Sequence, residues 1–318
     1  MGLSFTLLIG FRVEVGGDWF AYLDYYERAA LVSFSEAIEM NDPGYMALNW
    51  IAGLVDGGIF LVNLVCGAVI MVGVIAFARR QPMPWLAFLV AVPYMIIVVA
   101  MGYSRQGVAL GFELLALVAL KDGRTWRFVV WVICAALFHK TAVVLLPLAF
   151  MALNRNRVLA LVWLSLTGVV LGTVLLAEHY EAMWQSYIEN RMVSEGGGIR
   201  VAMNALPALL LLVFRRRLLA NENVQGLWLG LALLSIGCIP LVGLASTAVD
   251  RVALYFMPLQ LYVFSRVHRL FDSNLFKTVA VVGVVLGYGL VQWVWLNYAS
   301  HAPYWLPYQF YPLMVLWS

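Results

Sequence analysis

The chain has 318 residues, of which 64% are hydrophobic and only 12% are charged, and its formal net charge is +3. A soluble domain carries about 25% charged residues, so the composition excludes an ordinary soluble enzyme and predicts an integral membrane protein. We expect no nucleic-acid partner. The three cysteines all lie inside apolar runs, without the spacing of a disulfide framework or a zinc site.

The N-terminal region begins with the apolar residues 1–10. They are too few to cross about 30 Å of hydrocarbon at 1.5 Å per residue, so we expect a partial first helix. The following segment, residues 12–56, is more polar. Within it, residues 19–39 place aromatic and small side chains on one side of a helix, opposite Asp24, Glu27 and Arg28. This pattern is typical of an amphipathic helix at a membrane interface.

Apolar runs occupy most of the remaining chain, at roughly 58–78, 83–101, 106–120, 127–137, 141–153, 157–177, 202–214, 226–247, 251–265 and 276–296. Several are shorter than the roughly 20 residues that a straight span needs. We therefore predict an all-α, polytopic transmembrane helical bundle of about ten to eleven spans, some short or broken, with extracytoplasmic amphipathic helices. Residues 1–318 are expected to form a single integral membrane domain. The tail from residue 297 is aromatic, and its three prolines argue against a long helix.

The distribution of charge decides whether 127–153 is one helix or two segments that meet at residues 138–141. With two segments, 13 of the 20 basic residues share one face, namely Arg79, Arg80, Lys121, Arg124, Arg127, Arg155, Arg157, Arg215, Arg216, Arg217, Arg266, Arg269 and Lys277. The positive-inside rule makes this face cytoplasmic. A single helix would move the Arg215–Arg217 run outside, so we predict two segments. Residues 12–56 and 178–201 then become extracytoplasmic loops.

The outer face is therefore expected to hold the remaining basic residues together with most of the acidic ones. Arg105, Arg191, Arg200 and Arg251 lie there, near predicted helix ends. A guanidinium stays charged and binds phosphate oxygens through a planar fork, so these arginines are candidates for a clamp on a lipid diphosphate. The alternative is that they anchor the protein at the interface or form ion pairs, for example with Asp250.

His139 lies between two short apolar segments, where it is a candidate general base. The alternative is a hydrogen-bonded histidine that stabilises the helix break. Lys140 is expected either to neutralise phosphate or to extend towards the lipid headgroups.

Asp18 and Glu14 are the candidate carboxylates of the outer face. Either could deprotonate a sugar hydroxyl or hold a basic side chain in place. Asp18 beside Trp19 resembles a sugar-binding pair. The alternative is that Asp18 is the N-cap of the following helix. The aromatic residues of 19–50 and of the tail are expected to be interface belts or, alternatively, sugar platforms.

Glu113 interrupts an apolar run, so it must face the protein interior and find a partner there. The chain has no Asp-x-Asp pair, no phosphate-binding Walker loop and no G-x-S-x-G motif. We therefore expect no metal and no cofactor, and arginine rather than a metal ion to stabilise leaving-group charge.

Four motifs, in order along the chain, together resemble one family. They are Phe11, Arg12, Gly16, Asp18 and Trp19 with Tyr22; the run from Ser104 to Ala109; the run from Phe138 to Ala142; and the run from Asp250 to Phe256. These are similar to the motifs of the EpsG-type, Wzy-like membrane proteins of bacterial polysaccharide synthesis. The short N-terminus departs from the family, whose members usually have a complete first helix.

The resemblance implies a polymerase that joins oligosaccharide repeat units carried on undecaprenyl diphosphate. It would act in the bacterial inner membrane, at the periplasmic face. By position it places Arg12, Asp18, Arg105, His139 and Arg251 in the site. The residue types and the predicted outer face add Arg191, Arg200, Lys140 and Glu14 as further substrate-binding candidates. The resemblance also implies inversion at the anomeric carbon.

Our hypothesis is a metal-independent glycosyltransferase in which His139 or Asp18 is the catalytic base. Its partners would be the undecaprenyl-diphosphate-linked glycan donor and acceptor and the membrane lipid, and a chain-length regulator protein is a further candidate. One alternative is a ligase that transfers finished glycan, as an O-antigen ligase does. The other is a transporter or flippase of the lipid-linked oligosaccharide, for which repeated halves and ionisable residues near the midplane would be expected.

Overall fold

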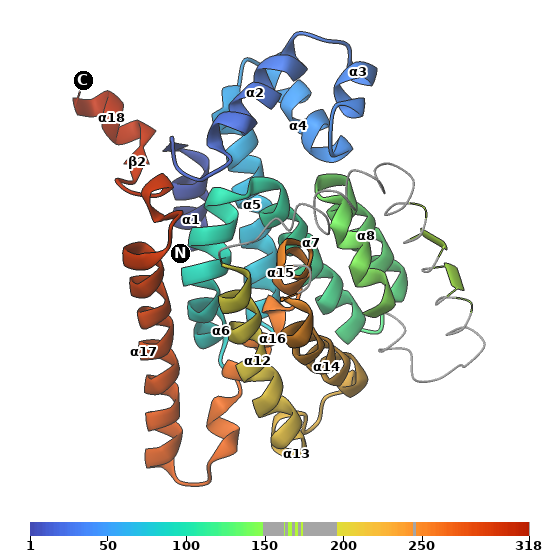
Figure 1. Cartoon of the computed structure of the whole chain (residues 1–318), viewed down its shortest axis with the longest axis vertical. Helices are drawn as coiled ribbons and strands as arrows, with labels where there is room; N and C mark the ends of the chain where they lie inside the picture. The colour runs from blue at the N-terminus through green and yellow to red at the C-terminus, as the bar shows by residue number, and fades with distance from the viewer. Residues whose placement is uncertain are drawn as a thin grey trace.

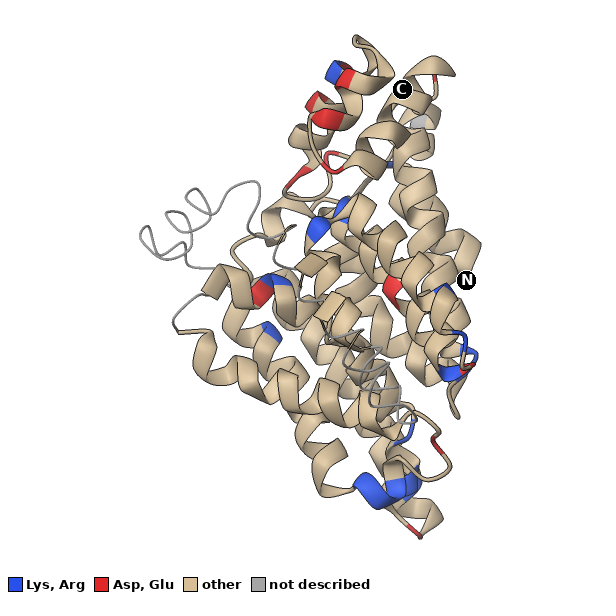
Figure 2. Ribbon diagram, turned by 90° about the vertical axis from the view of Figure 1, so that its right-hand side faces the viewer, with Lys and Arg blue, Asp and Glu red and all other residues tan. Residues whose placement is uncertain are grey.

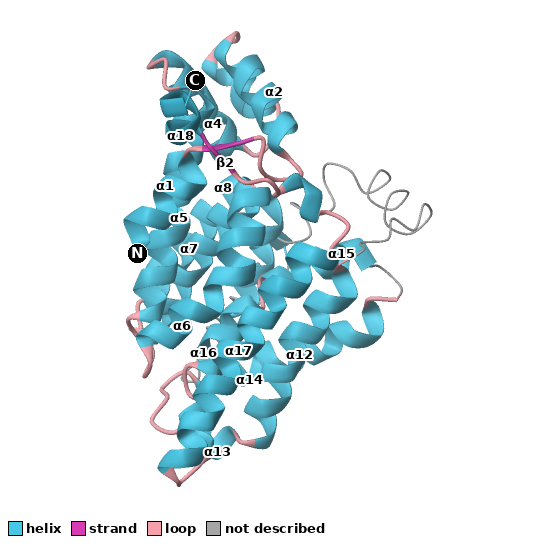
Figure 3. Ribbon diagram, turned by 90° about the vertical axis from the view of Figure 1, so that its left-hand side faces the viewer, coloured by secondary structure: helices cyan, strands magenta, loops and turns pink. Residues whose placement is uncertain are grey.

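The structure is a computed structural model of the whole chain, and it describes residues 1–148, 196–243 and 246–317 together with positions 162, 165, 166, 169, 170 and 173. Its described part is an elongated helical bundle, with a small strand pair near the end that carries the short helices of residues 19–54 (Figures 1 and 3). The all-α fold predicted from the sequence is confirmed.

The first part of the chain forms the outer helices and one set of packed helices: α1 (Gly2–Gly10), α2 (Trp19–Ala30), α3 (Phe34–Glu39), α4 (Pro43–Leu54), α5 (Gly58–Ala78), α6 (Pro84–Ala91), the π-helix η1 (Val92–Ala100), α7 (Ser104–Lys121), α8 (Thr125–Phe138) and the 3₁₀-helix η2 (Lys140–Leu145). The second part forms the other set: α12 (Gly197–Val213), α13 (Arg215–Leu218), α14 (Gln225–Leu241), α15 (Ser246–Leu254), α16 (Met257–Phe264), η4 (Val267–Leu270), α17 (Asn274–Tyr298), η5 (Ala302–Tyr304) and α18 (Tyr311–Trp317).

Within the described residues, only α5 and α17 are both long enough and apolar enough for a full membrane span. Shorter apolar helices cover Pro84–Ala100, Thr125–Phe138, Gly197–Val213 and Gln225–Leu241. The expected ten to eleven spans are therefore reduced to two long helices and several short ones. The reason is local: charged residues interrupt α7, and a two-residue break separates α15 from α16.

Two helical groups meet along α6 and η1. On one side these elements contact α5 and α7, and on the other side they contact α17. Helix α6 also contacts α16, which packs with α12. Element η1 is a π-helix, whose backbone hydrogen bonds run i→i+5 instead of i→i+4. The Trp305 indole N–H donates to the Ile97 carbonyl of η1 at 2.8 Å. The C-terminal tail is thereby fixed against the centre of the bundle.

Helices α5 and α7 cross at two glycines, where their backbones come very close. A Cβ on Gly73 would lie 2.2 Å from the Gly111 carbonyl oxygen, and a Cβ on Gly111 would lie 2.8 Å from the Ile70 Cα. Small residues at such a crossing permit close packing, as is common between helices in membranes. This contact fixes α7, whose first turn carries Arg105.

The outer helices form a cap on one end of the bundle rather than one continuous amphipathic helix over 19–39. Helix α3 begins after Ser33 with a capping box. The Glu36 backbone N–H donates to the Ser33 hydroxyl, and the Glu36 carboxylate accepts the Ser33 backbone N–H. Helix α2 packs against α4 through its buried face, which includes Trp19, Tyr22 and Ala29. The predicted amphipathic pattern is therefore present, but its apolar face packs on protein.

The two ends of the chain meet at this cap. Strand β1 (Arg12–Val13) pairs antiparallel with β2 (Gln309–Phe310), with Arg12 opposite Phe310. The predicted absence of a long helix in the tail is confirmed, because α18 has seven residues.

The bundle has two ends of opposite character. We call the end with α2, α3 and α4 the outer end, and the end with α13 the basic end. Figure 2 shows that acidic segments gather towards the outer end, whereas the Arg215–Arg217 turn lies at the opposite end. The expected break at 138–141 is present, because α8 ends at Phe138 and η2 begins at Lys140.

Candidate functional site

The loop before α2 is organised around a buried arginine. Arg12 is fully buried, and its guanidinium donates to the Ile9 carbonyl at 2.5 Å, to the Val15 carbonyl at 3.2 Å and to the Ser104 hydroxyl at 2.7 Å. It also lies 5.7 Å from the Trp19 ring centroid. These contacts join the loop to the first turn of α7. We therefore interpret Arg12 as a support of the site rather than as a substrate contact.

Gly16 allows this loop to lie directly against the turn between η1 and α7. Its φ is +106°, and a Cβ there would lie 2.6 Å from the Met101 carbonyl oxygen. An L side chain would therefore meet both backbone strain and a steric clash. Gly16 N–H also donates to the Tyr304 carbonyl at 2.8 Å, which attaches the C-terminal tail to the same loop.

Asp18 lies at the N-cap position of α2, but its side chain makes no capping hydrogen bond there. It instead accepts a hydrogen bond from the Tyr22 hydroxyl at 3.3 Å. The Trp19 side chain, the other member of the suggested sugar-binding pair, is buried beside Arg12. Glu14 is exposed and has a positive φ of 53°, so it lies at the surface of the loop.

Arg105 is held at the start of α7 by the turn before α4. It donates to the Asp42 carboxylate at 2.9 Å and to the Asn41 side-chain carbonyl at 2.7 Å. Its guanidinium also lies 5.5 Å from the Tyr25 ring centroid and 5.9 Å from that of Tyr22. Arg105 keeps about a quarter of its side chain exposed (24%). It is thus oriented by a carboxylate but remains open on one side.

Asp42 also connects this turn to the break after α8. Its second carboxylate oxygen accepts the backbone N–H of Lys140 at 3.3 Å. The same residue therefore bridges α7 and the start of η2, while Lys140 keeps an exposed side chain. Burial raises the pKa of the Asp42 carboxyl, and Arg105 and the Lys140 N–H partly offset that effect.

His139 adopts an extended backbone at the break between α8 and η2. Its Nδ1 lies 3.1 Å from the Thr141 hydroxyl, which lies 3.1 Å from the Tyr255 hydroxyl. The ring is therefore oriented through Nδ1 by a hydroxyl pair, which leaves Nε2 as the nitrogen for other contacts. The predicted alternative, a hydrogen-bonded histidine at a helix break, describes this arrangement, and it is compatible with a role as a base.

The late arginine motif lies on α15. Arg251 is exposed, whereas its neighbour Asp250 is buried and forms an ion pair with Arg200 of α12 at 2.5 Å. The anticipated alternative for the arginines, an ion pair with Asp250, therefore applies to Arg200. Arg200 also lies 5.9 Å from the Tyr94 ring centroid.

Arg105 and Arg251 lie within electrostatic range of both His139 and Asp18, and Lys140 lies within range of His139. Burial, together with the positive charges of Arg105, Arg251 and Lys140, lowers the pKa of His139 to about 3. Burial raises the pKa of Asp18, and the charges of Arg105 and Arg251 oppose that shift. His139 is thus neutral near pH 7, and positive charge from three different elements surrounds it.

Only some of the residues predicted for the site therefore lie close together. Asp18, Arg105, His139, Lys140 and Arg251 come together at the outer end. Arg200 approaches the same region, because Tyr103 lies within electrostatic range of both Arg200 and Asp18. Arg12 and Glu14 lie beneath and at the edge of this group, and Arg191 lies outside the described residues.

The sequence analysis missed the residues that orient this group, namely Asn41, Asp42, Thr141 and Tyr255. Thr141 and Tyr255 stand inside the quoted motifs, so their polar side chains in apolar surroundings were the available signal. Asp42 precedes Pro43 at a helix start and reads as an ordinary cap, so nothing in the sequence pointed to its contact with Arg105.

Glu113 lies within α7 and is buried, and neither carboxylate oxygen has a hydrogen-bond partner among the described residues. It lies within electrostatic range of the Tyr255 hydroxyl. No group of three or more metal-ligating side chains occurs in the described part of the chain.

Comparison with known proteins gives one match. The family model described as the EpsG family matches residues 1–310 of the chain. No curated protein and no solved structure matches significantly.

Proposed function

The chain belongs to the EpsG family of membrane proteins, which is associated with exopolysaccharide biosynthesis, and we propose that it is a polysaccharide polymerase. In this proposal it joins oligosaccharide repeat units that are linked to undecaprenyl diphosphate, at the periplasmic face of the bacterial inner membrane. The reaction is a glycosyl transfer that needs no metal ion.

The observation that carries the proposal is the convergence of Arg105, Arg251 and Lys140 around His139. Two of these cations are arginines, whose planar donors match phosphate oxygens. A diphosphate leaving group develops negative charge as its bond to the sugar breaks, and oriented cations in a partly buried site stabilise that charge strongly. The family association with glycan synthesis makes a lipid-linked sugar diphosphate the appropriate ligand for this charge.

The transfer itself follows from these positions. A hydroxyl oxygen of the acceptor sugar attacks the anomeric carbon of the donor sugar, and the bond from that carbon to the diphosphate oxygen breaks. The diphosphate leaves with the bonding electron pair, next to Arg105 and Arg251. His139 accepts the hydroxyl proton at Nε2 in the neutral tautomer whose Nδ1–H donates to the Thr141 hydroxyl oxygen. Arg200, which is paired with Asp250, supports the donor side.

The low pKa of His139 bears on how this base works. An imidazole with a pKa near 3 is a weak base; burial is the main cause of the low pKa, and the positive charges that lower it further are the ones that a diphosphate would neutralise. Binding of the donor should therefore raise the basicity of His139. Asp18, whose pKa is raised by burial, is the second candidate for the proton acceptor or for a hydrogen bond to the acceptor sugar.

The decisive experiment supplies the purified protein with undecaprenyl-diphosphate repeat units in the presence of a chelator and examines the product for a glycan ladder. We expect a ladder from the wild-type protein and none from Arg251→Ala or His139→Ala. Arg28→Ala is the matched control, because Arg28 is an exposed arginine on α2 that pairs with Asp24 in its own helix.

Each other outcome has a defined meaning. Transfer of a single preformed glycan to an acceptor without elongation would assign the protein to the ligases. Movement of unlengthened lipid-linked glycan across sealed vesicles would assign it to the transporters. A ladder that needs an added divalent cation would contradict the metal-independent mechanism.

A further inference from the structure

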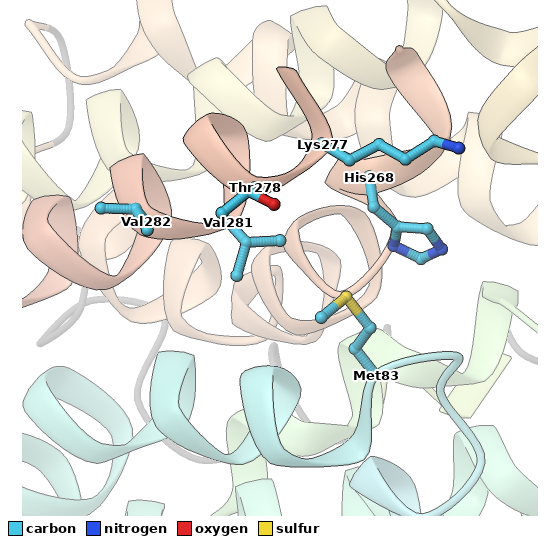
Figure 4. Close-up of a pocket in the computed structure, with 6 residues that line it drawn as sticks. All are labelled: Met83, His268, Lys277, Thr278, Val281 and Val282. Carbon is cyan, nitrogen blue, oxygen red and sulfur yellow. The ribbon is translucent and has the colours of Figure 1, made fainter. Parts of the chain in front are cut away.

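The basic end of the bundle contains a pocket that the proposed reaction does not use. It lies between the residue before α6 and the start of α17, has a volume of about 360 Å³, and is lined by Met83, His268, Lys277, Thr278, Val281 and Val282. Figure 4 shows Met83 and Val281 facing each other across the pocket, with His268 and Lys277 gathered at one end of it. The pocket is therefore apolar along its walls and cationic at one end.

The positive charge at this end is only partly balanced. Arg266 forms an ion pair with Glu222 at 3.4 Å, and Asp272 pairs with Arg217 at 3.2 Å. Lys277 and Arg269, in contrast, have no carboxylate within ion-pair distance among the described residues. Burial, with the charges of Arg269, Lys277 and Arg266, lowers the pKa of His268.

An apolar surface leads away from the pocket along α17. This helix has 25 residues and is one of the two full-length span candidates, and almost none of its apolar window is covered by protein. Exposed side chains continue from the pocket at Val282, Leu286 and Leu290, at intervals of four residues, so they share one face of the helix. A hydrocarbon chain that begins at the pocket can therefore lie along this face inside the bilayer.

We propose that this pocket binds an anionic phospholipid of the surrounding membrane. Its phosphate lies beside Lys277 and His268 at the cationic end of the pocket, and its acyl chains follow the exposed face of α17. Arg269, the neighbour of His268 in the chain, lies within electrostatic range of His268 and adds positive charge there. The argument rests on charge complementarity at one end and apolar contact at the other, which is the chemistry of an anionic lipid. Basic pockets between membrane helices at the positively charged side bind such headgroups, and each lysine or arginine near a membrane surface contributes about 1 kcal/mol.

The test is lipid retention by the purified full-length protein, measured by native mass spectrometry in detergent with added phosphatidylglycerol or phosphatidylcholine. We expect selective retention of phosphatidylglycerol. The double variant Lys277→Gln/Arg269→Gln should bind it roughly 25-fold more weakly, at about five-fold for each cation removed. Arg215→Gln/Arg216→Gln is the matched control, because it removes two exposed charges from the same end but outside the pocket.

A third variant keeps the test valid if the double variant does not fold. Val282→Trp places a bulky ring at a half-exposed position on the pocket wall without changing any charge. We expect it to reduce phosphatidylglycerol retention while circular dichroism and gel filtration remain unchanged.

Three results would overturn the proposal. They are equal retention of phosphatidylglycerol and phosphatidylcholine, an equal loss in the Arg215→Gln/Arg216→Gln control, and displacement of phosphatidylglycerol by stoichiometric undecaprenyl phosphate. The last result would assign the pocket to the isoprenoid substrate. None of these results depends on polymerase activity, since the readout is bound lipid.

Discussion

The Asp42 carboxylate contacts the Arg105 guanidinium at 2.9 Å, across 63 residues of sequence. Because the other oxygen of Asp42 accepts the Lys140 N–H, one carboxylate holds both the arginine of α7 and the break that carries His139. Two of the positively charged residues around the histidine are thus fixed relative to each other by a negative one.

Replacement of Asp42 should disorganise the site more than it destabilises the protein. Asp42→Ala removes a charge-assisted hydrogen bond, typically worth about 1.5–3 kcal/mol, and frees Arg105 to move. We expect at least a ten-fold loss of polymer synthesis, with donor binding weakened as well. Asp24→Ala is the control, because Asp24 forms an exposed pair on α2. Equal activity of the two variants in the ladder assay would show that Arg105 needs no such anchor.

Thr141 is predicted to act on catalysis through the orientation of His139. Thr141→Val keeps the shape of the side chain but removes the hydroxyl that lies 3.1 Å from both His139 Nδ1 and the Tyr255 hydroxyl. We expect kcat to fall roughly ten- to hundred-fold, as for other small misplacements of catalytic groups, with KM nearly unchanged. Thr141→Ser should restore most of the rate. A rise in KM with unchanged kcat would instead assign Thr141 to substrate binding.

The depressed pKa of His139 predicts how stability depends on pH. The folded protein keeps this imidazole neutral down to about pH 3, whereas in the unfolded chain it binds a proton below about pH 6.5. The unfolded state therefore binds more protons between these values, so this contribution is fully present above about pH 6.5 and is lost as the pH falls towards 3. Thermal unfolding in detergent should show a shallower pH dependence for His139→Gln than for the wild type. Parallel curves would place His139 in an ordinary environment.

The charged residues around His139 also predict that kcat and kcat/KM depend differently on pH. Arg105 from α7, Lys140 from η2 and Arg251 from α15 face His139, and Asp42 faces Arg105 and Lys140 from the opposite side. Since kcat/KM reports the free enzyme and kcat the bound complex, kcat/KM should not lose activity through protonation of His139 between pH 8 and 5.5. In contrast, kcat should fall towards acid pH, because a bound diphosphate raises the pKa of the imidazole. Identical acid limbs in both profiles would argue against this mechanism.

Features that depend only on the order of apolar runs along the chain could be predicted from the sequence. Counting basic residues on alternate loops placed Arg105, His139 and Arg251 on one face of the membrane, because the positive-inside rule needs only that order. The same count predicted the break at His139. Within the described residues only two helices have the length of a full span, because a short apolar run such as Met257–Phe264 can be packed inside a bundle as readily as across a bilayer.

Contacts between distant segments could not be predicted in this way. Gln260 illustrates the difficulty: its side chain donates to Asn204 at 2.7 Å and accepts from Tyr288 at 2.6 Å, and it thereby joins α12, α16 and α17. Each residue alone is a single polar group in an apolar helix. Their partnership becomes visible only when the three helices are packed. The burial of Arg12 belongs to the same class, because its Ser104 partner is 92 residues away.

Arg12 and Arg251 are predicted to have different roles: Arg12 supports the structure of the site, and Arg251 contacts the substrate. Arg12 is fully buried and hydrogen-bonded to two carbonyls and a hydroxyl, so Arg12→Gln leaves buried acceptors without their donors and should lower the free energy of unfolding by about 1–3 kcal/mol. Arg251 is exposed, so Arg251→Gln should lower the melting temperature in detergent less than Arg12→Gln does while it abolishes polymer synthesis. Arg251→Lys should recover only part of the activity, because an ammonium keeps the charge but lacks the planar fork that binds two phosphate oxygens. If Arg12→Gln melts like the wild type but binds the lipid-linked donor poorly, Arg12 contacts substrate after all, and the loop that it holds must open when the donor binds.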